Sequence, residues 1–407
     1  MNLQDSPCND LLYLCFNQDN ACFAGGTNTG FFAYNCEPFT ETTRKNFSSG
    51  GIGIIEMCYR TNILALVGGG KVPRYPRNKV MMWDDVNNRC IGELSFPSDV
   101  RAVKLRRDMV VVVLDRDIYI YNFQDLKLLE NRRTIVNTKG LCALCPHTNH
   151  RVMAFPGKER GLINVELFDI QRQVIIPAHE SELMALALNY DGTMVASASE
   201  RGTLIRVFST ASGNMLHELR RGAERAIIHS ICINPSSTYL ACSSDKGTIH
   251  VFSLMDEDRN DVKDSLQRNS NPLASSSSET DTQRLERTEL SSSRSGNVTN
   301  KPISSGVSVS TGQGSFLSEG QQQSLSSTFG VFFKSVLPKY FASRWSIAQF
   351  RVPETRMICA FGSQKNSLII IGADGSFYKV LFDPQKSTEC EKVKYFKFLS
   401  AEEADVH

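Results

Sequence analysis

The sequence predicts an all-β fold: a seven-bladed β-propeller of the WD-repeat type, with a long disordered loop in blade six. Three features predict it. These are an internal repeat, strand-like segments separated by turn residues along most of the chain, and one Trp-Asp dipeptide in MMWDD, residues 81–85. Repeats of about 40–45 residues that contain four strands are typical of propeller blades. The dipeptide alone is a weak sign, so the prediction depends on the repeat.

The repeat is clearest between residues 183–203 and 228–248. LMALALNYDGTMVASASERGT aligns without a gap on IHSICINPSSTYLACSSDKGT, and five residues coincide: Asn189 with Asn234, Thr193 with Thr238, Ser199 with Ser244, Gly202 with Gly247 and Thr203 with Thr248. A third copy begins at Leu11, and a weaker one begins at Ser367. Each copy has the pattern strand, turn, strand, turn, strand, and almost no segment has the period of an amphipathic helix.

These units predict seven blades, which begin near Leu11, Ile52, Val100, Gly140, Leu183, Ile228 and Met357. We expect the propeller to occupy residues 8–255 and 329–390, and residues 391–407 to form a C-terminal tail. Without residues 256–328 the chain averages about 48 residues per blade, close to the usual repeat length.

Residues 256–328 differ from the repeats in composition. They are rich in Ser, Asn and charged residues and poor in aromatic and β-branched ones. Such a segment cannot bury enough apolar surface to offset the entropy lost on ordering, so we expect a disordered loop inserted in blade six. Its many serines are candidate phosphorylation sites.

The stretch after the insertion, TFGVFFKSVLPKYFASRW, has large apolar residues at a helical period: Phe329, Phe332, Phe333, Val336, Leu337 and Tyr340. A short interfacial helix would bury this face in a bilayer and keep its lysines at the headgroups. A hydrophobic cluster packed on the propeller, or a strand, would explain the same residues, and Pro338 disfavours a helix interior. The position at the end of a long flexible loop favours membrane insertion.

Composition restricts the class of protein. The 407 residues have a net charge of +2, so no global basic field favours nucleic acid. No apolar run reaches the roughly 18 residues of a membrane span, and the N-terminus lacks the pattern of a secretory signal. The 12 cysteines are scattered, several of them inside apolar runs, and we expect them to be reduced and buried in a cytosolic protein.

No motif predicts catalysis, a cofactor or a metal. Cys142 and Cys145 precede His147 and His150, but GLCALCPH has the pattern of a strand, which would point the two thiols to opposite faces, and no second CxxC follows. His179 has no assignable orienting carboxylate. The turn GGGKVPRYPRNK lacks the Walker spacing and is expected to be an exposed basic loop, either solvated or in contact with a partner or anionic lipid. We therefore expect a protein that is not an enzyme.

The sequence ELRRG, residues 218–222, places two arginines at the end of the predicted rim strand of blade five. Side chains alternate along a strand, so Arg220 and Arg221 should enter different crevices on the two sides of that blade. Hydroxyl, imidazole and guanidinium groups lie nearby in the repeat, and together they suit a phosphorylated, sugar-like headgroup. Paired arginines are more often solvated or ion-paired, and the sequence LRRD at residues 105–108 has the same Leu-Arg-Arg without these surroundings.

Several motifs together resemble the PROPPIN family, seven-bladed propellers that bind phosphoinositides in autophagy and are called WIPI proteins in animals. The motifs are FNQD, LALVGGGK, VKLRRD, KGLCALCP, PAHESE, SASERGTLIRVF, LRRG, SSDKGTIHVF and LPKYFASRW. The similarity covers nearly the whole chain outside the insertion and is strongest to the third and fourth WIPI branches. Leu219 replaces a Phe that is common in the family motif.

The resemblance implies two headgroup sites. Arg220 would act with Ser181, Thr203 and Arg206, and Arg221 with Ser244, Thr248 and His250. The preferred lipids would be phosphatidylinositol 3-phosphate and the 3,5-bisphosphate, and the loop in blade six would insert into the membrane.

The resemblance also implies partners and a location. Asn17 and Asp19 match a family contact to the bridge-like autophagic lipid-transfer protein, although both also suit a turn. We expect a monomeric, cytoplasmic scaffold that is recruited peripherally to preautophagosomal and endosomal membranes and binds no nucleic acid. The alternative is a propeller scaffold that binds acidic or phosphorylated peptides without lipid.

Overall fold

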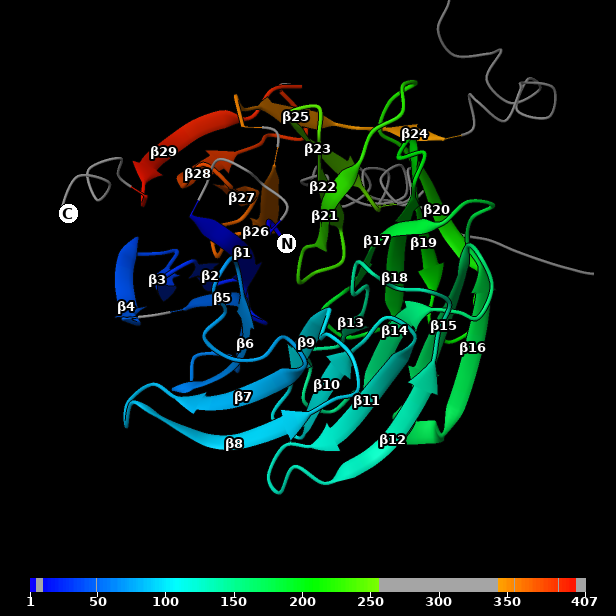
Figure 1. Ribbon diagram of the computed structural model, residues 1–407. Helices are drawn as coiled ribbons and strands as arrows, with labels where there is room; N and C mark the ends of the chain where they lie inside the picture. The colour runs from blue at the N-terminus through cyan, green and yellow to red at the C-terminus, as the bar shows by residue number, and fades with distance from the viewer. Residues whose placement is uncertain (5–9, 49, 256–342, 355, 387, 400–407) are drawn as a thin grey trace, which may run out of the picture. The chain divides into compact units, whose positions relative to one another are not determined.

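The computed structural model describes residues 1–4, 10–48, 50–255, 343–354, 356–386 and 388–399. These residues form seven sheets arranged around a ring, and their strands pair in antiparallel fashion except for one parallel pair in blade five (Figure 1). The predicted seven-bladed β-propeller is therefore confirmed. Residues 256–328 and the predicted membrane-inserting residues Phe329, Phe332, Phe333, Val336, Leu337 and Tyr340 lie outside the described part of the chain.

Blades one to three each consist of four strands that follow one another in the chain. Blade one contains β1 (Leu11–Phe16), β2 (Cys22–Thr27), β3 (Gly30–Asn35) and β4 (Thr40–Asn46). Blade two contains β5 (Gly51–Met57), β6 (Ile63–Gly69), β7 (Lys79–Asp84) and β8 (Arg89–Ser95). Blade three contains β9 (Ala102–Leu105), β10 (Met109–Val113), β11 (Asp117–Asn122) and β12 (Leu128–Arg133).

Blade four contains β13 (Ala143–Leu144), β14 (Val152–Pro156), β15 (Leu162–Leu167) and β16 (Arg172–Pro177), with a short 3-10 helix, η1 (Phe168–Ile170). Blade five contains β17 (Leu183–Leu188), β18 (Met194–Ser199), β19 (Leu204–Ser209) and β20 (Met215–Arg220), extended by β24 (Arg344–Trp345). Blade six contains β21 (Ile228–Ile233), β22 (Tyr239–Ser244), β23 (Thr248–Ser253) and β25 (Ala348–Arg351). Blade seven contains β26 (Met357–Phe361), β27 (Ser367–Gly372), β28 (Ser376–Leu381) and β29 (Glu391–Lys397).

The sequence of each strand depends on its place in the blade. Strand β10, MVVVV, is buried along its whole length because neighbouring blades cover both faces of the sheet. Strand β12, LLENRR, lies at the rim of the same blade and is mostly exposed. The hydrophobic core therefore lies between blades, and polar side chains gather on the outermost strands.

Blades one and seven close the ring by side-chain packing. Each sheet except that of blade five contains only its own four strands, and no described strand is exchanged between the first and last blades. Phe39 stacks on Phe396 with ring centroids 4.4 Å apart, and Phe23 lies 6.1 Å from Phe377. Lys379 of blade seven forms an ion pair with Glu37 in the first blade.

One boundary predicted from the sequence is wrong. Residues 391–397, expected to be part of a tail, form β29 and pair with β28 as the rim strand of blade seven. All seven residues of β29 are exposed. Four of the seven residues are charged, so the segment lacks the apolar run by which the buried strands were recognised.

Candidate functional site

The two faces of β20 point into different crevices. Leu219 is fully buried in a cluster with Ile228 and Ile231 of blade six. Glu218 pairs across the sheet with Arg206, and the Arg206 Nη1 donates to the carbonyl oxygen of Ala178, which follows blade four. Residues two apart in a strand share a face, so Arg220 points with Glu218 toward blade four.

Arg221 directly follows β20 and lies on the side of blade six. Its side chain is buried, its Nε donates to the carbonyl oxygen of Gly202 at 2.8 Å, and its Nη2 donates to the carbonyl oxygen of Glu224. No carboxylate in the described part of the chain forms an ion pair with it. Arg221 is therefore held by neutral backbone acceptors, and its positive charge is not cancelled by a close anion.

The crevice between blades five and six brings Arg221 together with residues of β23. Thr248 and His250 lie two apart on that strand and share a face. Burial lowers the pKa of His250 to about 4, and the charges of Arg221 and Arg351 lower it further. The His250 ring is thus neutral at physiological pH, and its Nδ1 lies 3.3 Å from the Oγ of Ser346. Ser244, at the end of β22, is fully buried.

Arg351 belongs to this crevice and was not identified from the sequence. It pairs with Thr248 across the sheet of blade six, as Arg220 pairs with Leu204 across the sheet of blade five. Arg351 thus has the same place on the rim strand of blade six that Arg220 has on blade five. The long insertion separates Arg351 from the rest of its blade, so the gap-free repeat alignment could not reach it.

The crevice between blades four and five contains a second histidine. The His179 Nε2 lies 3.0 Å from the Oγ of Ser197. Burial lowers the pKa of His179 to about 4; Arg206 lowers it further and Glu218 acts in the opposite direction. Arg206 donates from Nε to the Oε2 of Glu218 at 2.9 Å, and Ser343 donates to the other oxygen of that carboxylate at 3.2 Å. This crevice therefore contains an anion as well as two arginines.

The strand register changes one residue equivalence predicted from the repeat. Ser197 pairs with Arg206, whereas Cys242, its counterpart in the alignment, pairs with His250. Blade five therefore has one more residue before its third strand than the alignment implies. Arg206 matches His250 in position, and Thr203, aligned with Thr248 in the sequence, lies in the turn before β19.

The remaining predicted residues have these places. Ser181 is buried in the connection between β16 and β17, on the blade-four side where Arg206 also lies. Thr203 is half-buried, and its carbonyl oxygen accepts a hydrogen bond from the backbone N–H of Arg221. The backbone of Thr203 thus helps to hold Arg221 in place.

Asn17 and Asp19 form the turn between β1 and β2. The amide of Asn17 donates to the carbonyl oxygen of Tyr59 and accepts from the backbone N–H of Cys22, and the side chain is buried. Asp19 forms an ion pair with Arg60 at 2.8 Å and remains partly exposed. Asn17 therefore stabilises the turn, whereas Asp19 is accessible from solvent. The contact of both residues with a partner remains a prediction.

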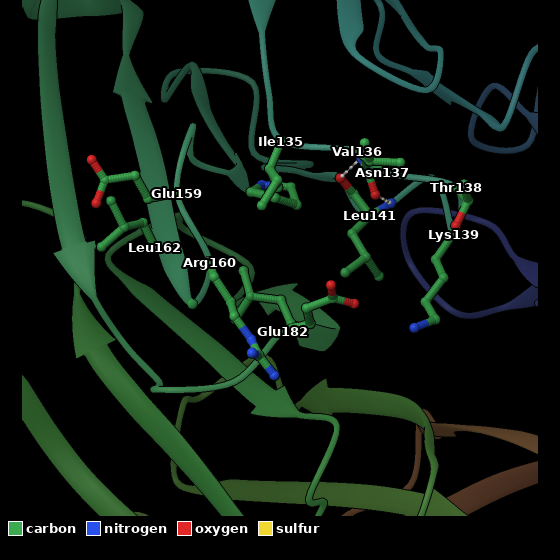
Figure 2. Close-up of a pocket in the computed structure, with 13 residues that line it drawn as sticks. Ile135, Val136, Asn137, Thr138, Lys139, Leu141, Glu159, Arg160, Leu162 and Glu182 are labelled. Atoms are coloured by element: carbon green, nitrogen blue, oxygen red, sulfur yellow. Dashed lines mark hydrogen bonds between the residues drawn. The ribbon is translucent and has the colours of Figure 1, made fainter.

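Other candidate sites have less support. Cys142 and Cys145 belong to different hydrophobic clusters, as expected for thiols on opposite faces of a strand. In the described ranges no three His, Cys, Asp or Glu side chains are placed to hold a metal ion. The pocket in Figure 2, between Ile135, Leu162, Arg160 and Glu182, has a volume of about 40 Å³ and is too small for an inositol ring.

The fold and the rim of blade five define a class of protein: a seven-bladed propeller with an arginine directed to each side of blade five. A family model, PROPPIN, matches residues 10–269. Autophagy-related protein 18e of Arabidopsis thaliana is 34% identical over 408 residues, which cover 98% of this chain and 91% of the relative. The chain belongs to the PROPPIN family.

Solved structures show the same fold. Hsv2 of Kluyveromyces lactis, with its complete loop 6CD, superposes with a TM-score of 0.66 at 22% identity, covering 96% of this chain and 100% of that one. The protein KlAtg21, solved as a complex with the coiled coil of AgAtg16, has a TM-score of 0.67, also at 22% identity and with the same coverage. In the described residues, no helix has the length and apolar content needed to cross a bilayer.

Proposed function

We propose that this protein is a phosphoinositide-binding peripheral membrane effector and scaffold of autophagosome formation. The observation that carries the proposal is the crevice between blades five and six, where Arg351 pairs across the sheet with Thr248 and the buried Arg221 bonds only to backbone carbonyl oxygens. Membership of the PROPPIN family and the autophagy-related names of relatives support the biological setting.

Each crevice offers the donors that a phosphorylated inositol needs. A guanidinium donates charge-assisted hydrogen bonds to phosphate oxygens, and hydroxyls supply neutral donors: Ser181 and Thr203 on the blade-four side, and Thr248 with the more deeply buried Ser244 on the blade-six side. One charge-assisted hydrogen bond contributes roughly 1.5–3 kcal/mol, so a single site binds weakly. Two sites that engage one membrane reinforce each other because the second binding event is intramolecular.

The proposal includes finer assignments. Arg220 acts with Ser181, Thr203 and Arg206, and Arg221 acts with Ser244, Thr248, His250 and the added Arg351. The preferred headgroups are those of phosphatidylinositol 3-phosphate and the 3,5-bisphosphate, and the stretch that contains Phe332 and Phe333 enters the bilayer. Recruitment takes the protein from the cytoplasm to preautophagosomal and endosomal membranes as a monomer.

The blade-one turn is proposed as the second functional surface. Asp19 and, through the turn that it supports, Asn17 contact a bridge-like lipid-transfer protein. The turn and the headgroup crevices lie in different blades, which allows lipid and protein to bind at the same time.

Flotation of vesicles that contain phosphatidylinositol 3-phosphate or the 3,5-bisphosphate tests the proposal. Arg220→Ala and Arg221→Ala should each reduce the floated fraction, and the double variant should abolish flotation. Arg107→Ala is the matched control, since Arg107 belongs to the other Leu-Arg-Arg sequence and stacks on Tyr59 at 5.1 Å. Unchanged flotation of the double variant would reject lipid binding at these crevices and favour the peptide-binding scaffold.

A further inference from the structure

A groove between blades three and four is separate from both arginine crevices. It lies between the rim strand β12 and the face of blade four formed by β14, β15 and β16, and has a volume of about 800 Å³. Figure 1 shows β12 and β16 along the outside of adjacent blades. Ligand pockets in proteins are commonly roughly 300–1,000 Å³, so the groove has the capacity of a binding site.

Asn164 is the unusual residue in this groove. Its side chain is 7% exposed and lines the groove, yet its carboxamide makes no hydrogen bond with any other residue that the structure describes. The carboxamides of other buried asparagines form hydrogen bonds within the protein: Asn137 bonds twice to Leu141, and Asn189 bonds to Thr193, Ser237 and Met194. Among the described residues, the fully enclosed polar atoms without a partner do not include those of Asn164, so its carboxamide reaches the groove while most of the residue is buried.

The wall of the groove is already organised by hydrogen bonds. Arg132 of β12 reaches across to blade four, where its Nε donates to Glu166 at 2.8 Å. Gln173 donates to the same carboxylate oxygen at 3.0 Å. These contacts join the two blades and fix the width of the groove, while Asn164, on the same strand as Glu166, remains available for a ligand.

The charges of the groove favour a neutral polar ligand. Three basic and three acidic side chains line it and balance one another: Arg132, Arg133, Lys158, Glu130, Glu159 and Glu166. An inositol phosphate or a nucleic acid would find no net attraction here. Ile175, which is exposed, adds apolar surface. The lining therefore combines a free amide, apolar contacts and no net charge.

The adjacent strand edge indicates which neutral ligand this is. Strand β12 ends its sheet, so its outer N–H and C=O groups have no strand partner among the described residues. Rim strand β20 of blade five already accepts an added strand, β24, from the chain itself. An extended peptide can pair with such an edge, and a peptide unit has the donor and the acceptor that match the Asn164 carboxamide.

We infer that the groove between blades three and four binds an extended peptide, which hydrogen-bonds through its backbone to Asn164 and places an apolar side chain near Ile175. This site is independent of the headgroup crevices. Membrane binding and peptide binding therefore need not compete.

Selection from a phage-displayed library of random dodecapeptides on the full chain tests this inference. Enriched peptides, synthesised with a fluorescein label, should lose roughly tenfold or more in affinity on Asn164→Leu, and should bind the double variant Arg220→Ala/Arg221→Ala as tightly as the original protein. Equal affinity for Asn164→Leu, or no enriched peptide, would overturn the inference. Loss of inositol 1,3-bisphosphate binding in Asn164→Leu would overturn it in favour of a headgroup.

A thermal unfolding experiment provides the second test. Because the Asn164 carboxamide makes no hydrogen bond with another described residue and Leu has a similar volume, Asn164→Leu should unfold at the same or a higher temperature than the original protein. Asn189→Leu is the matched control and should unfold at a lower temperature, since its three hydrogen bonds are lost. A decrease for Asn164→Leu as large as that of the control would assign Asn164 a structural role and overturn the inference.

Discussion

The chain contains Leu-Arg-Arg twice, and the two copies use their arginines differently. In blade three the Arg106 side chain is 3% exposed and donates to the carbonyl oxygens of Cys145, His147, Thr148 and His150 and to the carboxylate of Asp108. In blade five, Arg221 bonds to two carbonyl oxygens only. All three nitrogens of the Arg106 guanidinium donate to protein acceptors, whereas the Nη1 of Arg221 has no acceptor among the described residues.

The difference shows that the sequence Leu-Arg-Arg alone does not indicate whether its arginines stabilise the fold or could bind a ligand. The loop that follows Cys145 folds over Arg106 and fills its hydrogen-bonding capacity, whereas the crevice beside Arg221 contains a neutral histidine and a second arginine. The first copy holds two blades together. The second carries unused donors and uncancelled charge, which are the properties of an anion site.

The largest effect should come from Arg106→Ala. Removal of this buried guanidinium leaves four carbonyl oxygens without their donor and a cavity between the blades, so the free energy of unfolding should fall by about 3–4 kcal/mol. Urea denaturation followed by tryptophan fluorescence measures the change. Arg107→Ala is the control, with less than about 0.5 kcal/mol expected. A similar small loss for both variants would contradict the structural role of Arg106.

Arg221→Ala should affect headgroup binding more than the stability of the fold. Headgroup affinity should fall roughly tenfold or more, while the free energy of unfolding falls by only about 1–2 kcal/mol, because two hydrogen bonds are lost. Titration calorimetry with inositol 1,3-bisphosphate, together with urea denaturation, separates the two quantities. A variant that binds normally but is severely destabilised would place Arg221 with Arg106 as a structural arginine.

Arg351→Ala should weaken binding at the blade-six crevice by roughly fivefold, with little effect on stability, because the side chain is exposed and forms no ion pair within the described residues. Calorimetry in an Arg220→Ala background isolates this crevice. An unchanged dissociation constant would remove Arg351 from the site and leave Arg221 as its single arginine.

The histidines predict how stability depends on pH. Both His179 and His250 have a pKa of about 4 in the folded chain, below the ordinary value of 6.5. The unfolded chain therefore binds more protons between these values, and the free energy of unfolding should fall as pH decreases from about 6.5 toward 4. Denaturation curves at several pH values should show a weaker dependence in the double variant His179→Gln/His250→Gln. An identical slope would contradict burial of neutral rings.

The smallest effect should come from Arg60→Ala in the blade-one turn. The Arg60–Asp19 pair is exposed, so its loss should change the free energy of unfolding by less than about 1 kcal/mol. Urea denaturation measures it. A larger loss would show that the turn depends on this ion pair as well as on the hydrogen bonds of Asn17.

The fold could be predicted because a buried strand leaves a strong trace in the sequence. The expected blade starts at Leu11, Leu183, Ile228 and Met357 coincide with the first residues of β1, β17, β21 and β26. Strand β29 left no such trace, since all of its residues are exposed.

The site was only partly predictable. Alternation places Arg220 and Arg221 on opposite faces from sequence alone. The residues near each arginine depend on strand register. The gap-free alignment of blades five and six matched Thr203 with Thr248, whereas in the structure Leu204 has the position that corresponds to Thr248. Arg351 joins its blade only after the long insertion, and no local pattern could connect it with Thr248. His179 lies beside Ser181 in the sequence, but its proximity to Arg206 appears only when blades four and five are packed together.

Strand β24 has a consequence for any shortened form of the protein. It pairs with β20 in parallel, with Arg344 beside Leu219 and Trp345 beside Arg220, and Ser343 bonds to Glu218. The described chain thus stops at Met255 after the third strand of blade six, and resumes at Ser343 on blade five before it forms β25. A replacement linker for residues 256–342 must be long enough to reach that first attachment; one that leads directly into β25 would strip a strand from the sheet that presents the arginines.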